Sequence, residues 1–362
     1  MKSLDRILGC LIGGAVGDAL GRAVEFESAE SIFREYGEGG ITEYPEKLGG
    51  GLITDDTQMT LFTANALLVA ATDRALGRGG SRYAPYLSKG YADWLLTQGG
   101  YGGTVSISWL NNVRAMNVAR APGMTCISAI KSGAYGTPDE PINTSKGCGG
   151  VMRVAPIGLM LDDREECARL GAEAAALTHG HDLGFVPAAA LSVIVGLLSE
   201  DVNIGLLEVV EHSLSLCDEM FAHFPHVRDF RRLMKKAIAL SAEERADLEA
   251  IQELGEGWVA EESLAIAIYC ALKYPEDIER ALIAAVNHDG DSDSTGAITG
   301  NILGAYRGLS AIPPKYTEGL ELMEVLTEIG EDLYCVTCPD FDARDAHWQE
   351  KYVYHTYRPS AK

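Results

Sequence analysis

Apolar residues recur along most of this chain at the spacing of one face of an α-helix, whereas the alternation typical of a strand is scarce. Alanine and leucine, which both favour helices, dominate these segments. The pattern predicts an all-α protein with glycine-rich connections. Helices are expected over residues 56–71, 164–180, 187–200, 203–216, 231–240, 260–274 and 276–288.

The predicted helices follow one another without a clear linker, a repeat or a low-complexity block. A chain of 362 residues, of which 47% are hydrophobic, can build one large core. We therefore expect a single domain over 1–362, with a core at about 4–310 and a C-terminal extension at about 311–362. The longest loop is expected at 120–150, and the aromatic residues near the C-terminus are expected to pack back onto the core.

The apolar segment at the N-terminus is also expected to be helical. It carries glycines at every fourth position, which places them in one smooth stripe on the helix surface. They are Gly9, Gly13, Gly17 and Gly21. Such a stripe lets another backbone approach closely. It is not a dinucleotide fingerprint, because no G-x-G-x-x-G can be drawn through it and no strand precedes it. Asp18 and Glu25 follow at the end of this apolar segment, and buried carboxylates need partners.

The chain is acidic, with a formal net charge of −22. Broad binding of nucleic acid is therefore excluded, because a phosphate backbone is bound by Lys and Arg surfaces. An anionic ligand would need a local attraction, for which a bound metal cation is the obvious device. Asp5 and Asp18 flank and interrupt the first apolar run, and no run reaches 18 residues. We expect no signal peptide, no membrane span and a cytoplasmic protein.

Two acidic segments open predicted helices, TDDTQ at 54–58 and DGDSDS at 289–294. One Asp or Thr is enough to cap a helix, and Asp55 with Gln58 could form a capping box. The surplus carboxylates repel one another unless a cation neutralises them, and oxygen ligands suit Mg²⁺, Mn²⁺ or Ca²⁺. An EF-hand is excluded, because Ser294 and Gly300 stand where its glycine and glutamate belong.

Together the two acidic segments offer enough oxygen atoms to hold two divalent ions, which can activate water and bind substrate oxygens. Histidines offer a competing chemistry, in THGHD at 178–182 and NHDG at 287–290. Metal phosphohydrolases of the HD type use such His and His-Asp ligands, so this class stays an alternative. The glycine-rich segment 145–159 could cradle a phosphate with its backbone N–H groups.

Six segments, taken in chain order, resemble the ADP-ribosylglycohydrolase family, which includes the glycohydrolase that reactivates dinitrogenase reductase and the ADP-ribosylarginine hydrolases. The resemblance covers roughly residues 4–310 and rests on GGAVGDALGRAVEF, TDDTQMTL, SKGCGGVMRVAPIGL, THGH, LGEGWVAEESLAIAIYC and NHDGDSDSTGAITGNILGAYRG. It implies a compact orthogonal multi-helix, all-α fold. It also implies two divalent metal ions, Mg²⁺ or Mn²⁺, in a cleft.

The resemblance also implies roles for individual residues. The metal ligands would be Thr54, Asp55, Asp56, Asp291, Asp293 and Ser294. Glu25 would sit over the metals and act in acid–base chemistry, and it forms the catalytic set with Asp55 and Asp56. The substrate-binding residues would be Ser145, Lys146, Gly147, Cys148, Gly149, Gly150 and His179. Asp289 matches no ligand position and is expected to cap or to orient a neighbour.

Two positions depart from the family pattern. Ser294 stands where many relatives have threonine, which also offers a hydroxyl. Cys148 stands where some relatives have asparagine, which puts one contact of the loop in doubt.

The activity that the resemblance implies is hydrolysis of the N-glycosidic bond between ADP-ribose and a modified side chain, with arginine as the expected side chain. The partner would be an ADP-ribosylated protein, with a cognate ADP-ribosyltransferase or toxin as a further partner, and the chain is expected to be a monomer. Two alternatives are kept. One is a non-catalytic or immunity-type binder of an ADP-ribosylated protein or toxin, and the other is the HD-type phosphohydrolase.

Overall fold

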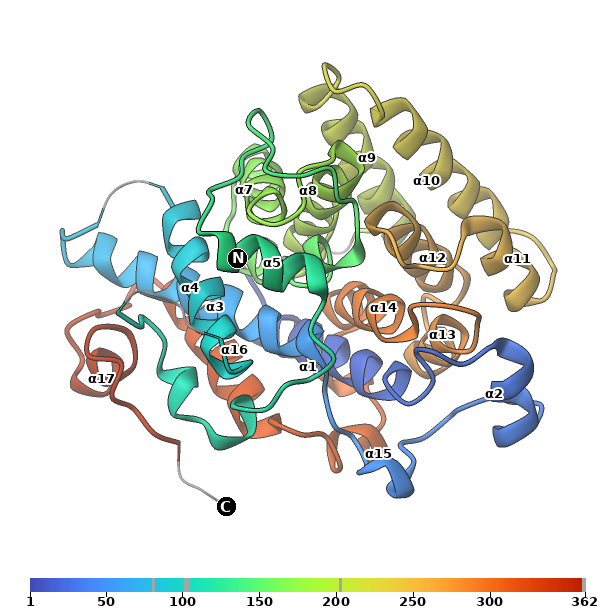
Figure 1. The fold of residues 1–362 in the computed structure, drawn as a ribbon, viewed down its shortest axis with the longest axis horizontal. Coiled ribbons are helices and arrows are strands. Elements are labelled where there is room, and N and C mark those ends of the chain that lie inside the picture. Colours follow the sequence, from blue (N-terminus) through green and yellow to red (C-terminus); the bar gives the residue numbers. More distant parts are fainter. Residues whose placement is uncertain (80–81, 101–104, 202–203, 360–362) are drawn as a thin grey trace.

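The structure is a computed structural model that describes residues 1–79, 82–100, 105–201 and 204–359. Over these residues the chain is all-α, as predicted, with isolated bridges but no β-strand (Figure 1). The helices are α1 (Leu4–Gly21), α2 (Ala29–Tyr36), α3 (Asp55–Ala75), α4 (Ala84–Thr97), α5 (Met124–Ser132), α6 (Ala155–Met160), α7 (Arg164–Ala176), α8 (Asp182–Leu198), α9 (Leu206–Met220), α10 (Val227–Ser241), α11 (Asp247–Leu254), α12 (Ala260–Lys273), α13 (Ile278–Val286), α14 (Ser292–Arg307), α15 (Pro314–Thr317), α16 (Met323–Val336) and α17 (Ala346–Tyr352).

Each segment with a sustained helical pattern forms a helix, although the bounds shift by a few residues. The start of the helix expected at 203–216 falls on Asn203, which lies outside the described residues, and α9 begins at Leu206. The end of the predicted domain, 360–362, lies outside them as well. The prediction of one continuous loop at 120–150 is wrong, because α5 forms within it. This helix is too short to show a clear period, and it ends at Gly133 in the left-handed conformation.

Helices α1 and α14 pack against each other at the centre of the fold, glycine against glycine (Figure 1). A Cβ atom on Gly13 would lie 2.6 Å from the carbonyl oxygen of Gly300, and one on Gly300 would lie 1.9 Å from the carbonyl oxygen of Gly13. The other pairs in this row are Gly9 with Gly304 and Gly17 with Gly296. The stripe in the first helix therefore serves close backbone packing, as predicted.

This antiparallel pairing brings the C-terminal end of α1 beside the N-terminal end of α14. Gly21, the last residue of α1, packs on the backbone of Ser292, the first residue of α14. The chain then leaves α1 through Glu25 and returns to open α3. The starts of α3 and α14 thus meet at one end of the central helix pair.

The aromatic C-terminal segment packs back onto the core, as predicted. Trp348 of α17 is buried, and its indole N–H donates to the Thr72 hydroxyl of α3 at 2.8 Å. Tyr352, also buried, donates its hydroxyl to the carboxylate of Asp332 in α16. None of the helices in the described part of the chain combines the length and the apolar character that a membrane crossing requires.

Candidate functional site

An open pocket of about 330 Å³ lies where the starts of α3 and α14 face the glycine-rich loop. Most of the predicted site residues line it: Glu25, Asp55, Asp56, Gly147, Cys148, Gly149, His179, Asp291, Asp293 and Ser294. The others lie next to these residues in the chain and are not in the lining: Thr54, Ser145, Lys146 and Gly150. The structure therefore brings both acidic segments and the loop to one cavity.

The start of α3 is capped by Thr54, whose hydroxyl accepts the N–H of Asp56 at 3.2 Å. The Asp55 carboxylate accepts the N–H of Gly123 at 3.1 Å, which ties the loop before α5 to the pocket. The capping box proposed for Asp55 and Gln58 does not form. The Gln58 side chain instead accepts the indole N–H of Trp94 at 3.3 Å, so tertiary packing decides its direction.

Asp18 of α1 accepts hydrogen bonds from the same helix start. Its buried carboxylate accepts the N–H of Thr54 at 3.0 Å and the N–H of Thr57 at 3.1 Å, and the Thr57 hydroxyl donates to it as well. Burial, and then the carboxylate of Asp293, raises the pKa of Asp18 to about 7. Asp18 was not predicted as a site residue, although its position inside an apolar helix was a signal.

The aspartates of the DGDSDS motif at the start of α14 have different partners. Asp291 caps the helix, because its Oδ1 accepts the N–H of Ser294 at 3.3 Å. Asp289 turns away and accepts the N–H of Ala29, the first residue of α2, at 2.9 Å. Its other oxygen accepts the amide of Gln252 at 3.3 Å. Asp289 therefore joins three chain segments outside the pocket.

The pocket carboxylates crowd together. Glu25, Asp291 and Asp293 each offer an oxygen, and these oxygens lie within 4.8 Å of one another. Burial, and then neighbouring carboxylates, raises the pKa of Glu25 to about 9. Burial raises the pKa of Asp56 and of Asp291 well above the usual range, and Asp293 adds to both shifts. Without a cation, these groups cannot all be ionised.

A cation fits this site. The Oδ2 atoms of Asp56 and Asp291 are buried and have no hydrogen-bond partner among the described residues. A buried oxygen without a hydrogen-bond partner lowers the stability of the folded state, and a bound metal ion would remove this cost. The donors that the two acidic segments offer are carboxylate and hydroxyl oxygens, which suit Mg²⁺ or Mn²⁺ better than zinc.

The opposite side of the pocket is the glycine-rich loop, which packs around His179. Cys148–Gly150 form a 3₁₀ turn, and the N–H of Cys148 donates to the carbonyl of Trp258 at 3.2 Å. A Cβ atom on Gly149 would lie 2.8 Å from Cys126 Sγ and 3.1 Å from the His179 ring. A side chain at this position would therefore press on Cys126 first and on His179 next.

His179 is held by a buried chain of hydrogen bonds. Arg153, itself buried, donates to the Thr178 hydroxyl at 2.7 Å, and that hydroxyl bonds His179 Nδ1 at 2.8 Å. Burial, and then Arg153, lowers the pKa of His179 to about 3, so the imidazole is neutral at physiological pH. Sequence reasoning missed Arg153, because only the fold shows what it contacts.

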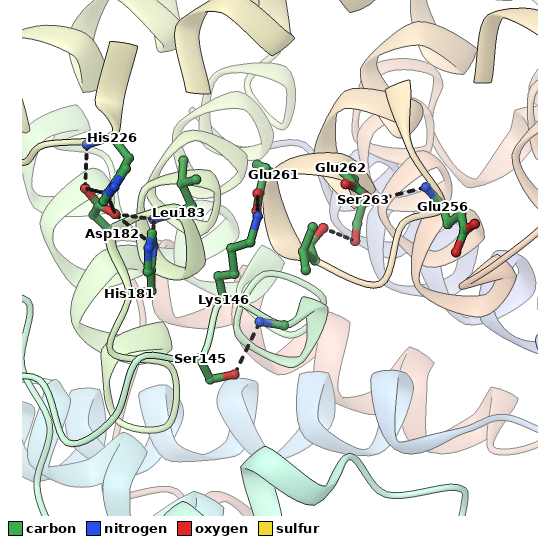
Figure 2. A network of polar contacts seen from close by, with 12 residues as sticks. Ser145, Lys146, His181, Asp182, Leu183, His226, Glu256, Glu261, Glu262 and Ser263 are labelled. Carbon is green, nitrogen blue, oxygen red and sulfur yellow. Dashed lines mark hydrogen bonds and ion pairs between the residues drawn. The ribbon is translucent and has the colours of Figure 1, made fainter. Parts of the chain in front are cut away.

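Ser145 and Lys146 anchor the loop. The Lys146 side chain forms an ion pair with Glu261 of α12 (Figure 2). The carbonyl of Ser145 accepts the N–H of His181 at 3.1 Å. The Ser145 hydroxyl lies 3.3 Å from that of Thr125 in α5. Both residues therefore tie the loop to neighbouring helices, and neither lines the pocket.

Two aromatic side chains, neither of them predicted, stand at the mouth of the pocket. Phe26 and Trp258 stack with ring centroids 5.7 Å apart and an interplanar angle of 19°. Phe26 is 76% exposed and Trp258 is 39% exposed. Large exposed aromatic surface beside a cavity is typical of a binding site. The signal available in the sequence was Trp258 within the GEGWVAEES segment.

The two His-Asp dyads do not meet at one site. His288 is buried, with Nε2 bonded to the Thr295 hydroxyl at 3.0 Å and Nδ1 to its neighbour's carbonyl at 2.9 Å. His181 instead gathers with Asp182 and His226. The arrangement that an HD-type centre needs is therefore not formed by these dyads.

The chain is similar to known proteins over most of its length. A family model described as ADP-ribosylglycohydrolase matches residues 1–341, which extends beyond the core expected at 4–310. The ADP-ribosylhydrolase ARH3 of Mus musculus is 26% identical over 92% of this chain and 92% of its own length. The ADP-ribosylarginine hydrolase Tri1 of Pseudomonas putida is 24% identical over 95% of this chain and 82% of its own.

A solved structure of an ADP-ribosylglycohydrolase-related protein complex is similar as well. It has a TM-score of 0.60 and 25% sequence identity, and the match covers 92% of this chain and 99% of that chain. Sequence and fold lead to the same conclusion: the chain belongs to the ADP-ribosylglycohydrolase family.

Proposed function

We propose that this protein is a metal-dependent hydrolase that removes ADP-ribose from modified protein side chains by cleaving the N-glycosidic bond of ADP-ribosylarginine. Family membership supports the hydrolysis of glycosidic bonds of ADP-ribose. The similarity to an ADP-ribosylarginine hydrolase supports arginine as the side chain. The observation that carries the proposal is the single pocket in which α3 and α14 join their acidic starts.

Two divalent ions, Mg²⁺ or Mn²⁺, would be held between the two helix starts. The ligands would be Thr54, Asp55, Asp56, Asp291, Asp293 and Ser294. When bound, such ions polarise water and bind hydroxyl oxygens of the ribose. The orphaned oxygens of Asp56 and Asp291 support this assignment, because each is a ligand atom without a competing protein partner.

In the proposed reaction, carboxyl groups of the chain transfer the protons. Glu25 lines the pocket beside Asp291 and Asp293, where its carboxyl group is placed to take up and return a proton. Asp56 is the second carboxyl placed to orient the attacking water. The remaining carboxylates would stabilise the positive charge that develops at the anomeric carbon as the guanidine leaves.

The diphosphate would lie against the glycine-rich loop. The N–H of Cys148 already bonds the carbonyl of Trp258, so the backbone donors would be those of Gly149 and Gly150. His179 is neutral and bonds Thr178 through Nδ1, which leaves Nε2 on the side of Gly147 and Gly149. Local N–H donors and cations would thus overcome the repulsion between an acidic protein and an anionic substrate.

The proposal is tested by incubating the protein with arginine-, serine- and base-linked ADP-ribose, with and without Mg²⁺ or Mn²⁺. Free ADP-ribose is expected from the arginine linkage and only with the divalent ion. Release from serine or a base instead would overturn the arginine assignment. Metal-independent binding without release would favour a non-catalytic or immunity-type binder, and phosphate release from nucleotides would favour the phosphohydrolase.

A further inference from the structure

A second cluster of metal-binding side chains lies at the start of α8, outside the pocket described above. His181 is the N-cap of α8, Asp182 is its first residue, and His226 directly precedes α10. Figure 2 shows the carboxylate of Asp182 between the two histidines. The Nδ1 atoms of His181 and His226 each lie 2.8 Å from Asp182 Oδ1, and the ring centroids are 4.7 Å apart.

The carboxylate of this cluster is fixed in orientation. Its side chain is only 5% exposed, and its two oxygens accept backbone N–H groups from both sides of the cluster. Oδ1 accepts the N–H of Leu183 at 3.0 Å, and Oδ2 accepts the N–H of His226 at 2.8 Å. A carboxylate held in this way is an oriented ligand rather than a mobile surface charge.

The two histidines contact the same carboxylate oxygen of Asp182. His226 can donate from Nδ1 to Asp182 while neutral, but His181 Nδ1 accepts the N–H of Leu183 at 3.0 Å. The same nitrogen lies 2.8 Å from Asp182 Oδ1. A metal ion can replace the proton between an imidazole nitrogen and a carboxylate, so these close contacts suit shared coordination of one ion.

We propose that His181, Asp182 and His226 form a second metal site, for a zinc-type transition-metal ion. Two imidazole nitrogens and one carboxylate oxygen suit zinc, whereas the carboxylate-rich starts of α3 and α14 suit Mg²⁺ or Mn²⁺. Tetrahedral zinc bonds of about 2.1 Å place ligand atoms roughly 3.4 Å apart, so the 2.8 Å contacts must open by about 0.6 Å. The His226 side chain is 44% exposed, which lets an ion enter and a water complete the shell.

The site would join two parts of the fold next to the substrate loop. It links the start of α8 to the segment before α10, and the N–H of His181 donates to the carbonyl of Ser145 at 3.1 Å. An ion bound there would hold the base of the loop that carries Cys148 and Gly149. Because it binds the folded state only, it would also stabilise the protein.

The experiment measures binding of Zn²⁺ and Co²⁺ in the Asp291→Asn/Asp293→Asn variant, in which two of the competing pocket carboxylates are removed. We expect one Zn²⁺ per chain and the strong visible absorption of four-coordinate Co²⁺. Adding His226→Ala, or His226→Gln as the milder change, should weaken Zn²⁺ binding at least about tenfold and abolish that absorption. His223→Ala removes an exposed histidine nearby and serves as the matched control, with unchanged binding.

Two results would overturn the proposal. One is the absence of Zn²⁺ binding to the folded Asp291→Asn/Asp293→Asn variant. The other is equal Zn²⁺ affinity with and without His226, which would place any bound ion elsewhere. Both readouts are independent of glycohydrolase turnover, so the second metal site and the proposed function can fail separately.

Discussion

The carboxylate of Asp18 in α1 accepts the backbone N–H of Thr54, the N-cap of α3, at 3.0 Å. The same helix packs through its glycines on α14, whose first turn carries Asp293. One helix therefore sets the distance between the two acidic segments. Asp18 needs no contact with an ion to do so, because it acts by positioning the residues that would bind it.

Asp18→Asn should weaken Mn²⁺ binding about tenfold or more, because the helix start that carries Asp55 and Asp56 loses an acceptor. The asparagine NH₂ group would face N–H donors of Thr54 and Thr57, which should cost about 1–3 kcal/mol of the free energy of unfolding. Calorimetric Mn²⁺ titration and urea denaturation measure the two effects. Wild-type Mn²⁺ affinity in the folded variant would contradict the positioning role.

Asp291 and Asp289 provide a matched pair within one motif. Asp291→Asn alters a carboxylate in the pocket, so we expect loss of ADP-ribose release from an arginine-modified protein and weaker Mg²⁺ binding. Asp289→Asn alters a side chain that bonds Ala29 and Gln252, so turnover should stay near wild type. Steady-state assays at saturating Mg²⁺ distinguish them. Equal losses in both variants would argue against the assignment of Asp291 as a ligand.

Local sequence patterns are enough to predict most of the helices and the two acidic segments of the site. The periodicity predicts the long helices because each buries one face, and the acidic motifs mark the starts of α3 and α14 because caps and ligands must be close in sequence. The second glycine row, at 296, 300 and 304, has the same spacing as the first and was equally open to prediction.

Other residues of the site could not be predicted, because their roles depend on contacts between distant elements. Arg153 reaches His179 through the Thr178 hydroxyl, and Trp258 meets Phe26 only after α1 and α12 have both packed on α14. Gln58 had a plausible local role as a capping-box partner, which the tertiary contact with Trp94 overrides.

Gly300→Ala should destabilise the protein by about 3 kcal/mol or more, since the added methyl would lie 1.9 Å from the carbonyl oxygen of Gly13 and backbone cannot yield cheaply. Gly39→Ala is the control, because Gly39 is exposed and its nearest neighbour would be 3.8 Å away. That change should stay within about 1 kcal/mol of wild type. Urea denaturation measures the free energy of unfolding of both variants. Similar losses in Gly300→Ala and Gly39→Ala would refute the close-packing role of Gly300.

Trp258→Ala should raise KM for the ADP-ribosylated substrate about twofold to tenfold with little change in kcat. Its ring lies at the pocket mouth against Phe26, and an aromatic contact is worth about 0.5–1.5 kcal/mol. The backbone carbonyl that accepts the N–H of Cys148 remains in the variant. Tyr354→Ala, at an exposed aromatic outside the pocket lining, is the control. An unchanged KM in Trp258→Ala would exclude substrate contact.

His179 should make the protein less stable in acid. Its pKa is about 3 in the folded state against an ordinary value of 6.5, so only the unfolded chain takes up a proton as the pH falls below 6.5. The stabilising contribution is therefore complete above pH 6.5 and is lost progressively toward pH 3. Carboxyls with raised pKa values, such as Asp18, act in the opposite sense, so the comparison must be with a variant.

His179→Gln removes this titration while keeping a polar side chain of similar size. Between about pH 8 and pH 5, wild type should lose about 2 kcal/mol more of its free energy of unfolding than the variant does. His223→Gln, at an exposed histidine, should follow wild type. Urea denaturation at several pH values in this interval gives the difference. Parallel pH profiles for wild type and His179→Gln would show that His179 is not held neutral in the folded protein.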